Sequence, residues 1–517
     1  MLTRYDRYEP DMTDTNRIVI LDDQRFLLWT SIIIALLFSI SFCTLPIWSS
    51  TFDYDKNYNE GWNAYHQVDA KTGNIYITDS PYVFTNYTPV SFYIIGALST
   101  PTNVIMVGRV FSIGSFFALL LLVGFISRRL GASLPESLFG VALCIGLIGA
   151  YHGANIGIDD PQLLGSAIGL IGIGIYISSR PCLLNTIAIL ITVLAAGMVK
   201  QALVAVPLAI LTDLTRRDRR RGIQLVGAGI FFGAAAMIVL YLIFGQISLA
   251  QIFAPRQYSI HKAATNTLIY LSESAVTLPV MVLFLLIFMR SQANQFALIY
   301  LLTALFVGIL LIGGAGTASN IFIDVALASS IAAPVIMRSM REDLRVDRSI
   351  ITCFIVVSIY GPMLRVPYAV EQLRDALSGS LRAEAQTFQE DLTFMANYQG
   401  EAFCHSPMLC FRAQRSFFID PFNAGQAIKL RRVDPSPLLS KIAQREFAIV
   451  QLAAIELSTL DGGYSFGDGL ELEFRCLLET RYVKVRNSGS RVFYVPRQSN
   501  LSEGDSPPRY HDRRCTA

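Results

Sequence analysis

The chain has 517 residues, of which 53% are hydrophobic and only 16% are charged. Soluble globular proteins are less apolar than this, so the composition predicts a polytopic membrane protein. The formal net charge of +3 is small for a chain of this length and gives no indication of nucleic-acid binding.

The polar N-terminal segment, residues 1–26, leads into an apolar stretch that is long enough to cross a bilayer instead of serving as a cleavable signal. Roughly 20 apolar residues are needed for one span. On this criterion we expect a membrane domain over residues 27–368 with about eleven spans, and a short interfacial or re-entrant helix at 90–99. The expected spans are 27–48, 103–126, 136–150, 163–179, 183–198, 201–214, 222–246, 271–289, 295–313, 319–338 and 349–368.

Arginine residues gather in every second loop of this arrangement. Short cytoplasmic loops carry the excess of Lys and Arg, so the pattern predicts a cytoplasmic N-terminus. The parity depends on a break at Lys200, because residues 183–214 would otherwise form one tilted helix. The clusters expected inside are Arg128, Arg129, Arg180, Arg216, Arg217, Arg219, Arg220, Arg221, Arg290, Arg338, Arg341, Arg345 and Arg348.

Most polar residues that are candidates for chemistry fall on the opposite, outer side. The first outer loop, 49–89, contributes Asp53, Asp55 and Glu60 together with several aromatic residues. The remaining candidates are His66, His152, Asp159, Asp160, Lys200, Arg256, His261, Lys262 and Asn320. An acidic pair such as Asp159 and Asp160 is also compatible with simple helix capping.

Three charged residues lie within otherwise apolar runs. A lysine or arginine at the centre of a membrane helix costs on the order of 2.5 to 3.5 kcal/mol, so such a residue needs either the surface or a charged partner. Lys200 therefore reaches the outer boundary or meets a charged ligand. Arg109 and Asp324 are expected to pair with each other or with a ligand.

The order and the side of several short motifs resemble those of the GT-C class of membrane glycosyltransferases. The closer resemblance is to the bacterial branch that includes protein O-mannosyltransferases and lipid A arabinosyltransferases. It covers residues 27 to about 370, and no single motif in it is specific. The matching stretches are 59–65 (NEGWNAY), 86–93 (NYTPVSFY), 108–109 (GR), 159–162 (DDPQ), 199–201 (VKQ) and 319–324 (SNIFID).

The resemblance implies an inverting enzyme that moves a sugar from a polyprenyl-phosphate donor to a glycan or lipid acceptor. It implies a general base among the carboxylates of the first outer loop, Glu60, Asp53 and Asp55. Many relatives have an Asp-Glu pair where this chain has Asn59 and Glu60. We therefore keep two hypotheses for Asp53 and Asp55, which could act in catalysis or bind a divalent cation.

The other site residues follow from the same resemblance and from the charge that develops on the leaving phosphate. Cations should stabilise that charge, and Lys200, Arg256 and Lys262 are the candidates. The residues expected to bind substrate are Tyr65, His66, Arg109, Asp159, Asp160, Lys200 and Asn320. The expected location is the bacterial inner membrane, in contact with lipid and with no nucleic-acid partner.

Residues 369–497 have a soluble composition and predict a small extracytoplasmic α/β domain, followed by a disordered tail at 498–517. The expected elements are a helical stretch at 369–395, a strand at 447–452 and a hairpin with strands at 482–485 and 492–495. A disulfide between Cys404 and Cys410 and two free thiols are both compatible with the sequence, and His405 is expected at the surface.

Two other functional classes are compatible with these features. Charged residues within spans and broken helices also occur in transporters and flippases, although no internal repeat is apparent in the hydropathy. The departure at Asn59 would suit a non-catalytic scaffold of an envelope polysaccharide system. The large outer loop and the external domain favour an enzyme that acts at the membrane surface.

Overall fold

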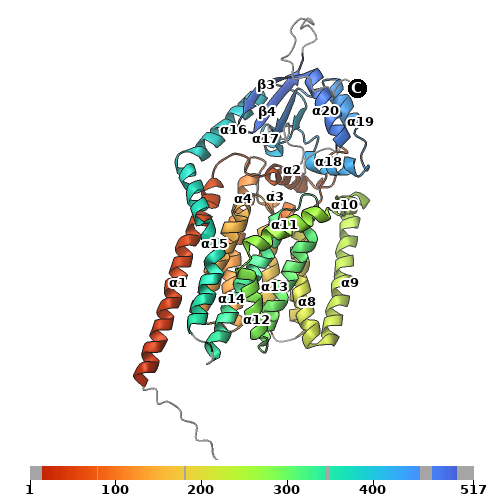
Figure 1. Cartoon of the computed structure of the whole chain (residues 1–517). Coiled ribbons are helices and arrows are strands. Elements are labelled where there is room, and N and C mark those ends of the chain that lie inside the picture. Colours follow the sequence, from red (N-terminus) through yellow and green to blue (C-terminus); the bar gives the residue numbers. More distant parts are fainter. Residues whose placement is uncertain are drawn as a thin grey trace, which may run out of the picture.

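The chain is built in two tiers, a bundle of long helices and a smaller α/β unit at one end of it (Figure 1). The computed structural model describes residues 14–77, 80–179, 182–343, 346, 348–453 and 468–497. The bundle contains α1 (Asp14–Ser49), α4 (Val104–Arg129), α5 (Leu134–His152), α6 (Gln162–Ser178), α7 (Leu183–Val199), α8 (Ala205–Arg217), α9 (Arg219–Phe244), α11 (Ile260–Glu273), α12 (Thr277–Ile287), α13 (Gln292–Leu311), α14 (Ile323–Glu342) and α15 (Arg348–Leu377). Short helices lie at the junction of the tiers: α2 (Tyr58–Thr72), α3 (Val90–Ala97), η1 (Gly153–Asn155), α10 (Gln246–Ile252) and η2 (Ser319–Phe322).

Seven of the described helices are long and apolar enough to cross a membrane. An eighth span results if the bent pair α11 and α12 is counted as one. The span expected at 271–289 corresponds to the end of α11 and to α12, and the chain bends by 76° between these two helices. Three other expected spans are shorter helices, with 17 residues each in α6 and α7 and 13 in α8. The expected short helix at 90–99 is present as α3.

Helix α14 lies at the centre of the bundle and is buried along almost its whole length. Its many Ala and Ser residues allow α5 and α13 to pack closely against it. Gly140 of α5 shows how close this contact is, since an added Cβ would lie 2.6 Å from the carbonyl oxygen of Ser330. The centre of the bundle is therefore a packed core and not a channel.

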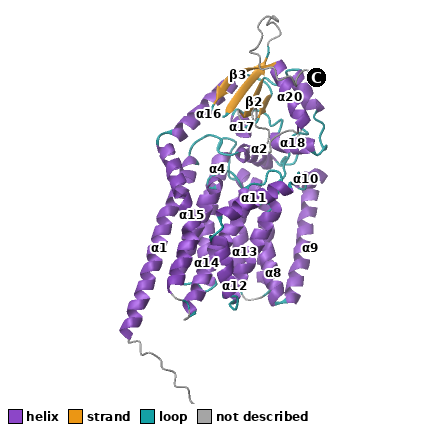
Figure 2. Cartoon of the chain, in the orientation of Figure 1, coloured by secondary structure: helices purple, strands orange, loops and turns teal. Residues whose placement is uncertain are grey.

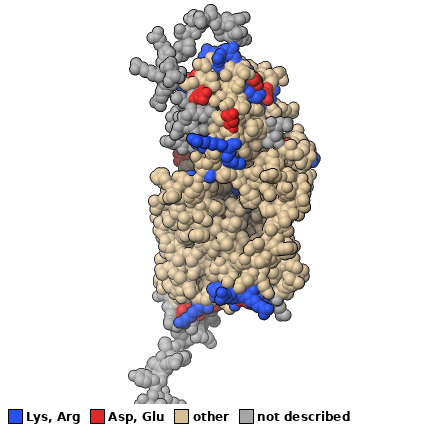
Figure 3. Space-filling model, turned by 90° about the vertical axis from the view of Figure 1, so that its right-hand side faces the viewer, with Lys and Arg blue, Asp and Glu red and all other residues tan. Residues whose placement is uncertain are grey.

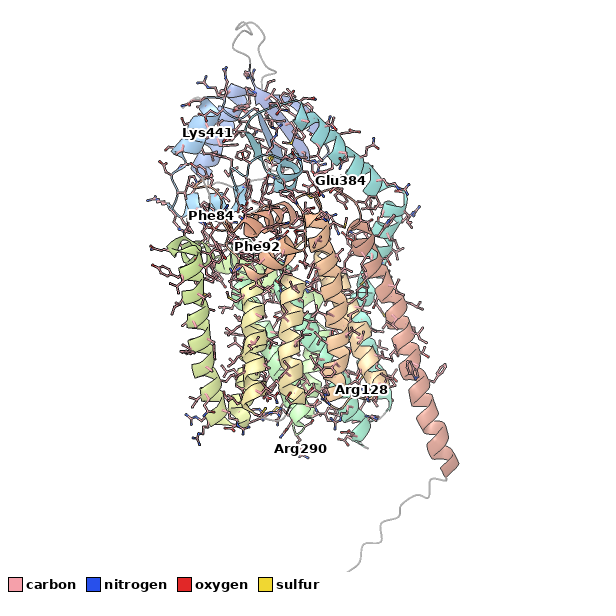
Figure 4. The ribbon with its side chains drawn as sticks, turned by 180° about the vertical axis from the view of Figure 1, so that it is seen from behind. Phe84, Phe92, Arg128, Arg290, Glu384 and Lys441 are labelled. Carbon is pink, nitrogen blue, oxygen red and sulfur yellow. A yellow bond between two sulfur atoms is a disulfide. The ribbon has the colours of Figure 1, made fainter. Side chains whose placement is uncertain are left out.

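Charged residues are segregated along the long axis of the molecule. On the face seen in Figure 3, a broad belt across the bundle has almost no Lys, Arg, Asp or Glu, and Lys and Arg gather below it. Arg128 and Arg290 lie at this lower end, remote from Glu384 and Lys441 in the α/β unit (Figure 4). The apolar belt and the long helices indicate a membrane-embedded protein.

All the strands lie in the upper tier, as Figure 2 shows. They form one mixed sheet of order β1-β2-β4-β3, with β1 parallel to β2 and the other neighbours antiparallel. The strands are β1 (Ala402–Cys404), β2 (Ile449–Ala453), β3 (Tyr482–Ser488) and β4 (Arg491–Pro496). The helices around them are α16 (Ser380–Ala396), α17 (Pro407–Arg412), α18 (Pro421–Lys429), α19 (Ser436–Ala443) and α20 (Asp468–Arg481).

Several local predictions for this tier can be compared with the structure. The predicted hairpin forms from β3 and β4, with Gly489 at a φ of 59° in its turn. Cys404 and Cys410 form a disulfide that joins β1 to α17. The predicted soluble boundary at 369 lies inside α15, which continues to Leu377. His405 is half-buried, so it is less exposed than expected, and the predicted tail at 498–517 lies outside the described residues.

The α/β unit packs directly onto the first outer loop. Gly61 of α2 faces α17 so closely that an added Cβ would lie 1.9 Å from the backbone nitrogen of Met408. Any larger residue at this position would separate the two helices. The two tiers are thereby joined by close backbone packing at α2.

Candidate active site

Helix α2 begins at an asparagine cap that fixes the position of its first residues. The side chain of Asn57 accepts a hydrogen bond from the backbone N–H of Asn59, which satisfies a donor that the helix leaves free. At the other end, Gly73 closes the helix with a φ of 82°. Residues 58–72 thus form a rigid element between the bundle and the α/β unit.

Glu60 in the first turn of α2 is held by Arg109 of α4. Arg109 Nε lies 2.7 Å from Oε1 of Glu60, and Nη2 lies 2.8 Å from Oε2. The backbone N–H groups of Lys56 and Asp159 donate two more hydrogen bonds to the same carboxylate, at 3.0 and 3.2 Å. Both side chains are buried, so the Glu60 carboxylate is fully engaged by groups of the protein itself.

Arg109 therefore has a partner different from the one considered from the sequence. Its remaining N–H groups donate to the carbonyl oxygens of Ser50, Phe52 and Tyr54 at 2.5 to 3.1 Å. Asp324 instead accepts a long hydrogen bond of 3.5 Å from the hydroxyl of Tyr300. The predicted alternative of an ion pair between Arg109 and Asp324 is not present.

Asp53 and Asp55 connect the first outer loop to the α/β unit. Asp53 Oδ1 lies 2.7 Å from Nη2 of Arg412. Asp55 Oδ1 lies 2.9 Å from Nη1 of Arg491, and its Oδ2 accepts a hydrogen bond of 2.6 Å from Ser406. Burial raises the pKa of Asp55, while Arg491 and Ser406 favour its charged form.

These contacts also test whether the two aspartates fit a divalent cation. A hard cation such as Mg²⁺ or Ca²⁺ needs several free oxygen ligands. The oxygens of Asp53 and Asp55 face different arginines. Among the described residues there is no group of three His, Cys, Asp or Glu side chains that could hold a metal. The arrangement does not fit a metal site.

Asp159, His66 and Tyr65 lie in the packed interface around α2. Asp159 Oδ1 accepts a hydrogen bond of 2.9 Å from Gln67, and burial raises the pKa of Asp159 well above its usual range. His66 Nδ1 lies 3.1 Å from the hydroxyl of Thr85, and burial lowers the pKa of His66 to about 3. Tyr65 stacks on an aromatic ring of the α/β unit. None of the three lines the main cavity.

The main cavity, of about 530 Å³, lies beside α2 where the two tiers meet. Four separate segments form its walls: the first outer loop, the chain around the start of α11, the connection between α13 and η2, and α18 of the α/β unit. The lining residues are Tyr58, Asn59, Trp62, Asn86, Tyr87, Arg256, Gln257, Ser259, Lys262, Gly313, Ala315, Gly316, Thr317, Ala318, Phe422, Asn423, Gln426 and Lys429. Gly316 is required in this wall, since an added Cβ would lie 2.5 Å from the Phe422 ring.

Three cations line this cavity, and in the described chain no carboxylate forms an ion pair with any of them. Arg256 Nη2 lies 2.8 Å from Oδ1 of Asn423 and its guanidinium lies over the Phe422 ring at 5.3 Å. Lys262 donates to two backbone carbonyls, those of Gly314 and Thr317, at 2.7 and 2.9 Å. Lys429 is at the end of α18. The cavity is therefore positively charged and suited to an anion.

Two buried carboxylates lie one side chain behind the cavity wall. Asp160 Oδ2 accepts a hydrogen bond of 3.1 Å from Asn59 Nδ2, and its Oδ1 lies 3.1 Å from Nζ of Lys200. Asp420 accepts a hydrogen bond of 2.5 Å from the hydroxyl of Tyr58, and burial raises the pKa of Asp420. Asn59 and Tyr58 both line the cavity, so each separates one carboxylate from it.

Lys200 therefore forms an ion pair with an aspartate at the upper end of the bundle. Besides its ion pair with Asp160, its ammonium lies 5.1 Å from the centre of the Tyr87 ring. Asn320 lies in η2, next to the cavity wall at Ala318 but not among the lining residues. The structure thus brings Asp160 and Lys200 to the cavity edge and leaves Asn320 just outside it.

Sequence reasoning missed several cavity residues. Tyr58, Asn59, Asn86 and Tyr87 lie within or beside motifs that it had identified, so a closer view of those motifs could have found them. Arg256 and Lys262 were expected as phosphate ligands and do line the cavity. The contribution of α18 had no sequence signal, because only the docking of the α/β unit brings it there.

The fold resembles known membrane glycosyltransferases. No protein-family model matches the sequence, and no curated protein matches it. The lipid A arabinosyltransferase ArnT of Cupriavidus metallidurans in the apo state has a TM-score of 0.57 at 10% identity, covering 89% of this chain and 97% of that chain. The same enzyme bound to undecaprenyl phosphate gives 0.52 at 10% identity, with 92% and 98% covered. The apo oligosaccharyltransferase of Archaeoglobus fulgidus gives 0.51 at 13% identity, with 92% and 75% covered. At these identities the likeness concerns the fold, and this chain has the fold of the GT-C glycosyltransferases.

Proposed function

We propose that this protein is a membrane glycosyltransferase that uses a polyprenyl-phosphate sugar as donor and the main cavity as its active site. The observation that carries this proposal is the group of three cations without carboxylate partners, Arg256, Lys262 and Lys429, in a cavity at the membrane boundary. The three cations are partly exposed and bring positive charge to one cavity, so an anionic ligand is the natural partner. The fold supports the same class of enzyme.

The donor phosphate would lie between Arg256 and Lys262. As the bond between sugar and phosphate breaks, negative charge develops on the phosphate oxygens, and fixed cations stabilise it. Lys262 is held by two carbonyls and Arg256 by Asn423, so both are positioned before substrate binds. The isoprenoid chain would extend from the cavity into the bilayer, which explains a site at the helix ends.

The sugar would occupy the part of the cavity lined by aromatic rings and amides. Trp62 and Tyr87 offer ring faces, and their ring centres lie 5.1 Å apart. Asn86, Asn423 and Gln426 supply amide groups that both donate and accept hydrogen bonds, as sugar hydroxyls require. Lys429 adds a positive charge on the side of the α/β unit.

We assign the general base to Asp160. Glu60 is held by Arg109, and Asp53 and Asp55 face arginines of the α/β unit, so none of the three expected carboxylates is directed at the cavity. Only the Asn59 side chain separates Asp160 from the main cavity, and a rotation of that side chain would open Asp160 to the cavity. The base would take the proton of the acceptor hydroxyl as that oxygen attacks the anomeric carbon, which gives inversion.

The three first-loop carboxylates then act by positioning. Glu60 fixes the start of α2, and Asp53 and Asp55 dock the α/β unit that closes the cavity. The arginine-rich lower end would face the cytoplasm and the cavity would face the extracytoplasmic side of the bacterial inner membrane. The acceptor would be an envelope glycan or lipid.

Binding of undecaprenyl phosphate to the purified full chain tests the donor site. We expect Arg256→Gln and Lys262→Met to weaken binding by about tenfold each, because each removes a charged contact to phosphate. Lys71→Met is the matched control, since Lys71 lies on α2 outside the cavity and donates only to the carbonyl of Ser99. Unchanged affinity in both cavity variants would contradict the proposed donor site.

A further inference from the structure

A second cavity, of about 360 Å³, lies where the upper ends of α1, α5 and α15 meet. Its walls are formed by small and apolar residues of α1 and α5 and by aromatic rings. Two cations reach it, Lys56 from the first outer loop and Arg365 from α15. No residue of the main cavity takes part in it.

The two cavities lie on either side of the chain that starts α2. Lys56 lines the second cavity, whereas Tyr58 and Asn59 line the main one. The ion pair of Glu60 with Arg109 holds this short partition in place. A ligand in the second cavity would therefore sit within a few residues of the proposed active site.

Lys56 is a cation whose hydrogen bonding is incomplete. Its ammonium donates to the carbonyls of Pro46 and Gly157 at 3.2 and 2.9 Å, and no ion pair in the described part of the chain involves it. An ammonium has three donors, so one N–H remains for a ligand. Burial lowers the pKa of Lys56 to about 8, so the group is still mainly charged at neutral pH.

Arg365 supplies a second cation with donors to spare. Its guanidinium pairs with Glu273 and lies 5.7 Å from the centre of the Tyr151 ring. A guanidinium has five N–H donors in a plane, and the ion pair with Glu273 uses only part of them. Lys56 and Arg365 together give the cavity two positive groups and one compensating carboxylate.

The cavity opens toward the part of the surface that faces the bilayer. Tyr368, which lines it, is 57% exposed, and Leu364 one turn earlier on α15 is also exposed. Ile40 of α1 is exposed on the neighbouring helix. Tyrosine at the end of a span is typical of the interface between lipid tails and headgroups. Apolar chains could therefore lie along α1 and α15 while a polar headgroup enters the cavity.

We propose that the second cavity binds the phosphate of a membrane lipid headgroup, with Lys56 and Arg365 as the groups that contact it. Phosphate offers several acceptor oxygens and a negative charge, which match the free donors of an ammonium and a guanidinium. A bulk phospholipid and a phosphate-bearing acceptor lipid share this chemistry. The site is separate from the donor site and does not depend on the proposed reaction.

Native mass spectrometry of the purified full chain tests this site with dioleoyl phosphatidic acid as the probe. Undecaprenyl phosphate is added first to saturate the main cavity. We expect wild type to bind one phosphatidic acid in addition, and Lys56→Met to weaken that binding by about tenfold. Dioleoylglycerol, which has the same tails without the phosphate, should not bind.

Lys56→Met also removes two hydrogen bonds that hold the loop, so a second variant is needed. Ala154→Leu fills the cavity from an exposed position and leaves Lys56 and its contacts in place. It should lose phosphatidic acid as Lys56→Met does, whereas Lys71→Met should bind as wild type. Unchanged binding in both cavity variants would overturn the proposal, and so would equal binding of dioleoylglycerol.

Two further measurements distinguish a bulk phospholipid from an acceptor lipid and separate this proposal from that of the donor site. A polyprenyl-phosphate sugar is added to the protein, and the mass of the lipid bound in the second cavity is measured. If this lipid gains the mass of a sugar, the second cavity holds an acceptor. If its mass is unchanged, the second cavity holds a bulk lipid. Arg256→Gln should retain phosphatidic acid while losing undecaprenyl phosphate. Failure of the donor site would abolish undecaprenyl phosphate binding in wild type without changing the effect of Lys56→Met on phosphatidic acid.

Discussion

Arg109 donates hydrogen bonds to both carboxylate oxygens of Glu60, and the side chains of Arg109 and Glu60 are 1% and 0% exposed. This pair fixes the first turn of α2 against α4. Tyr58 and Asn59, on the same turn, line the main cavity. Arg109, a charged residue inside an apolar helix, is thus explained by a structural partner beside the proposed active site.

Glu60→Gln should destabilise the protein, because it leaves the Arg109 guanidinium buried without a counter-ion. Removal of one partner of a buried ion pair typically costs about 3 to 5 kcal/mol. The double variant Glu60→Gln with Arg109→Gln should recover part of that loss. Thermal unfolding in detergent measures both. A Glu60→Gln protein that unfolds as wild type does but has lost transfer would make Glu60 the base instead.

Asp160→Asn alone would leave Lys200 buried and unpaired, so the informative variant is Asp160→Asn combined with Lys200→Met. This double variant is neutral at the site and should remain folded while losing at least about 100-fold in transfer, as expected for loss of a general base. Asp159→Asn is the matched control. Burial already disfavours the charge of Asp159, so its amide should keep both fold and transfer. Wild-type turnover in the double variant would exclude Asp160 and direct attention to Asp420.

His66 should make the folded state sensitive to acid. Burial lowers its folded-state pKa to about 3, below the usual value near 6.5. The group therefore stabilises the fold above pH 6.5, and this contribution falls as the pH drops toward 3, by about 1.4 kcal/mol per pH unit well below 6.5. Melting of wild type and His66→Gln between pH 7.5 and 5 should show the steeper loss in wild type. Parallel curves would show that the ring is not kept neutral.

The topology can be checked with reporter fusions at residues 218 and 400. Asp218 lies between α8 and α9 among the arginines of the lower end, and Gly400 precedes β1 in the α/β unit. We expect the fusion at 218 to report the cytoplasm and the fusion at 400 the outer side. Reports from the same side would remove the basis for placing the active site outside.

The sequence was sufficient for much of the bundle because apolar runs are a direct physical signal of membrane helices. It located the ends of α4, α7 and α13 to within a few residues. The predicted spans did not include the 76° bend between α11 and α12, although Ser272, Glu273, Ser274, Thr277 and Pro279 interrupt the apolar run at 271–289. Apolarity alone does not distinguish a straight helix from a broken one.

The partners of the charged residues were harder to predict from the sequence than the helices. The sequence identified Arg109, Glu60, Asp160 and Lys200 as unusual, but each can pair with any residue that the fold brings near. The pairing of Arg109 with Glu60 joins residues 49 positions apart. The contribution of α18 depends on contacts more than 300 residues apart, such as that between Asn86 and Asn423. Local patterns contain no information about such pairs.

Sugar transfer by the purified full chain in lipid nanodiscs tests the central claim most directly. A panel of labelled polyprenyl-phosphate sugars is supplied with envelope lipids, and release of polyprenyl phosphate is measured together with the labelled product. We predict that wild type and Lys71→Met consume one donor of the panel, and that Arg256→Gln and the Asp160→Asn with Lys200→Met variant lose at least about 100-fold. Equal donor consumption by wild type and by both of these variants would contradict the assignment of the reaction to this cavity.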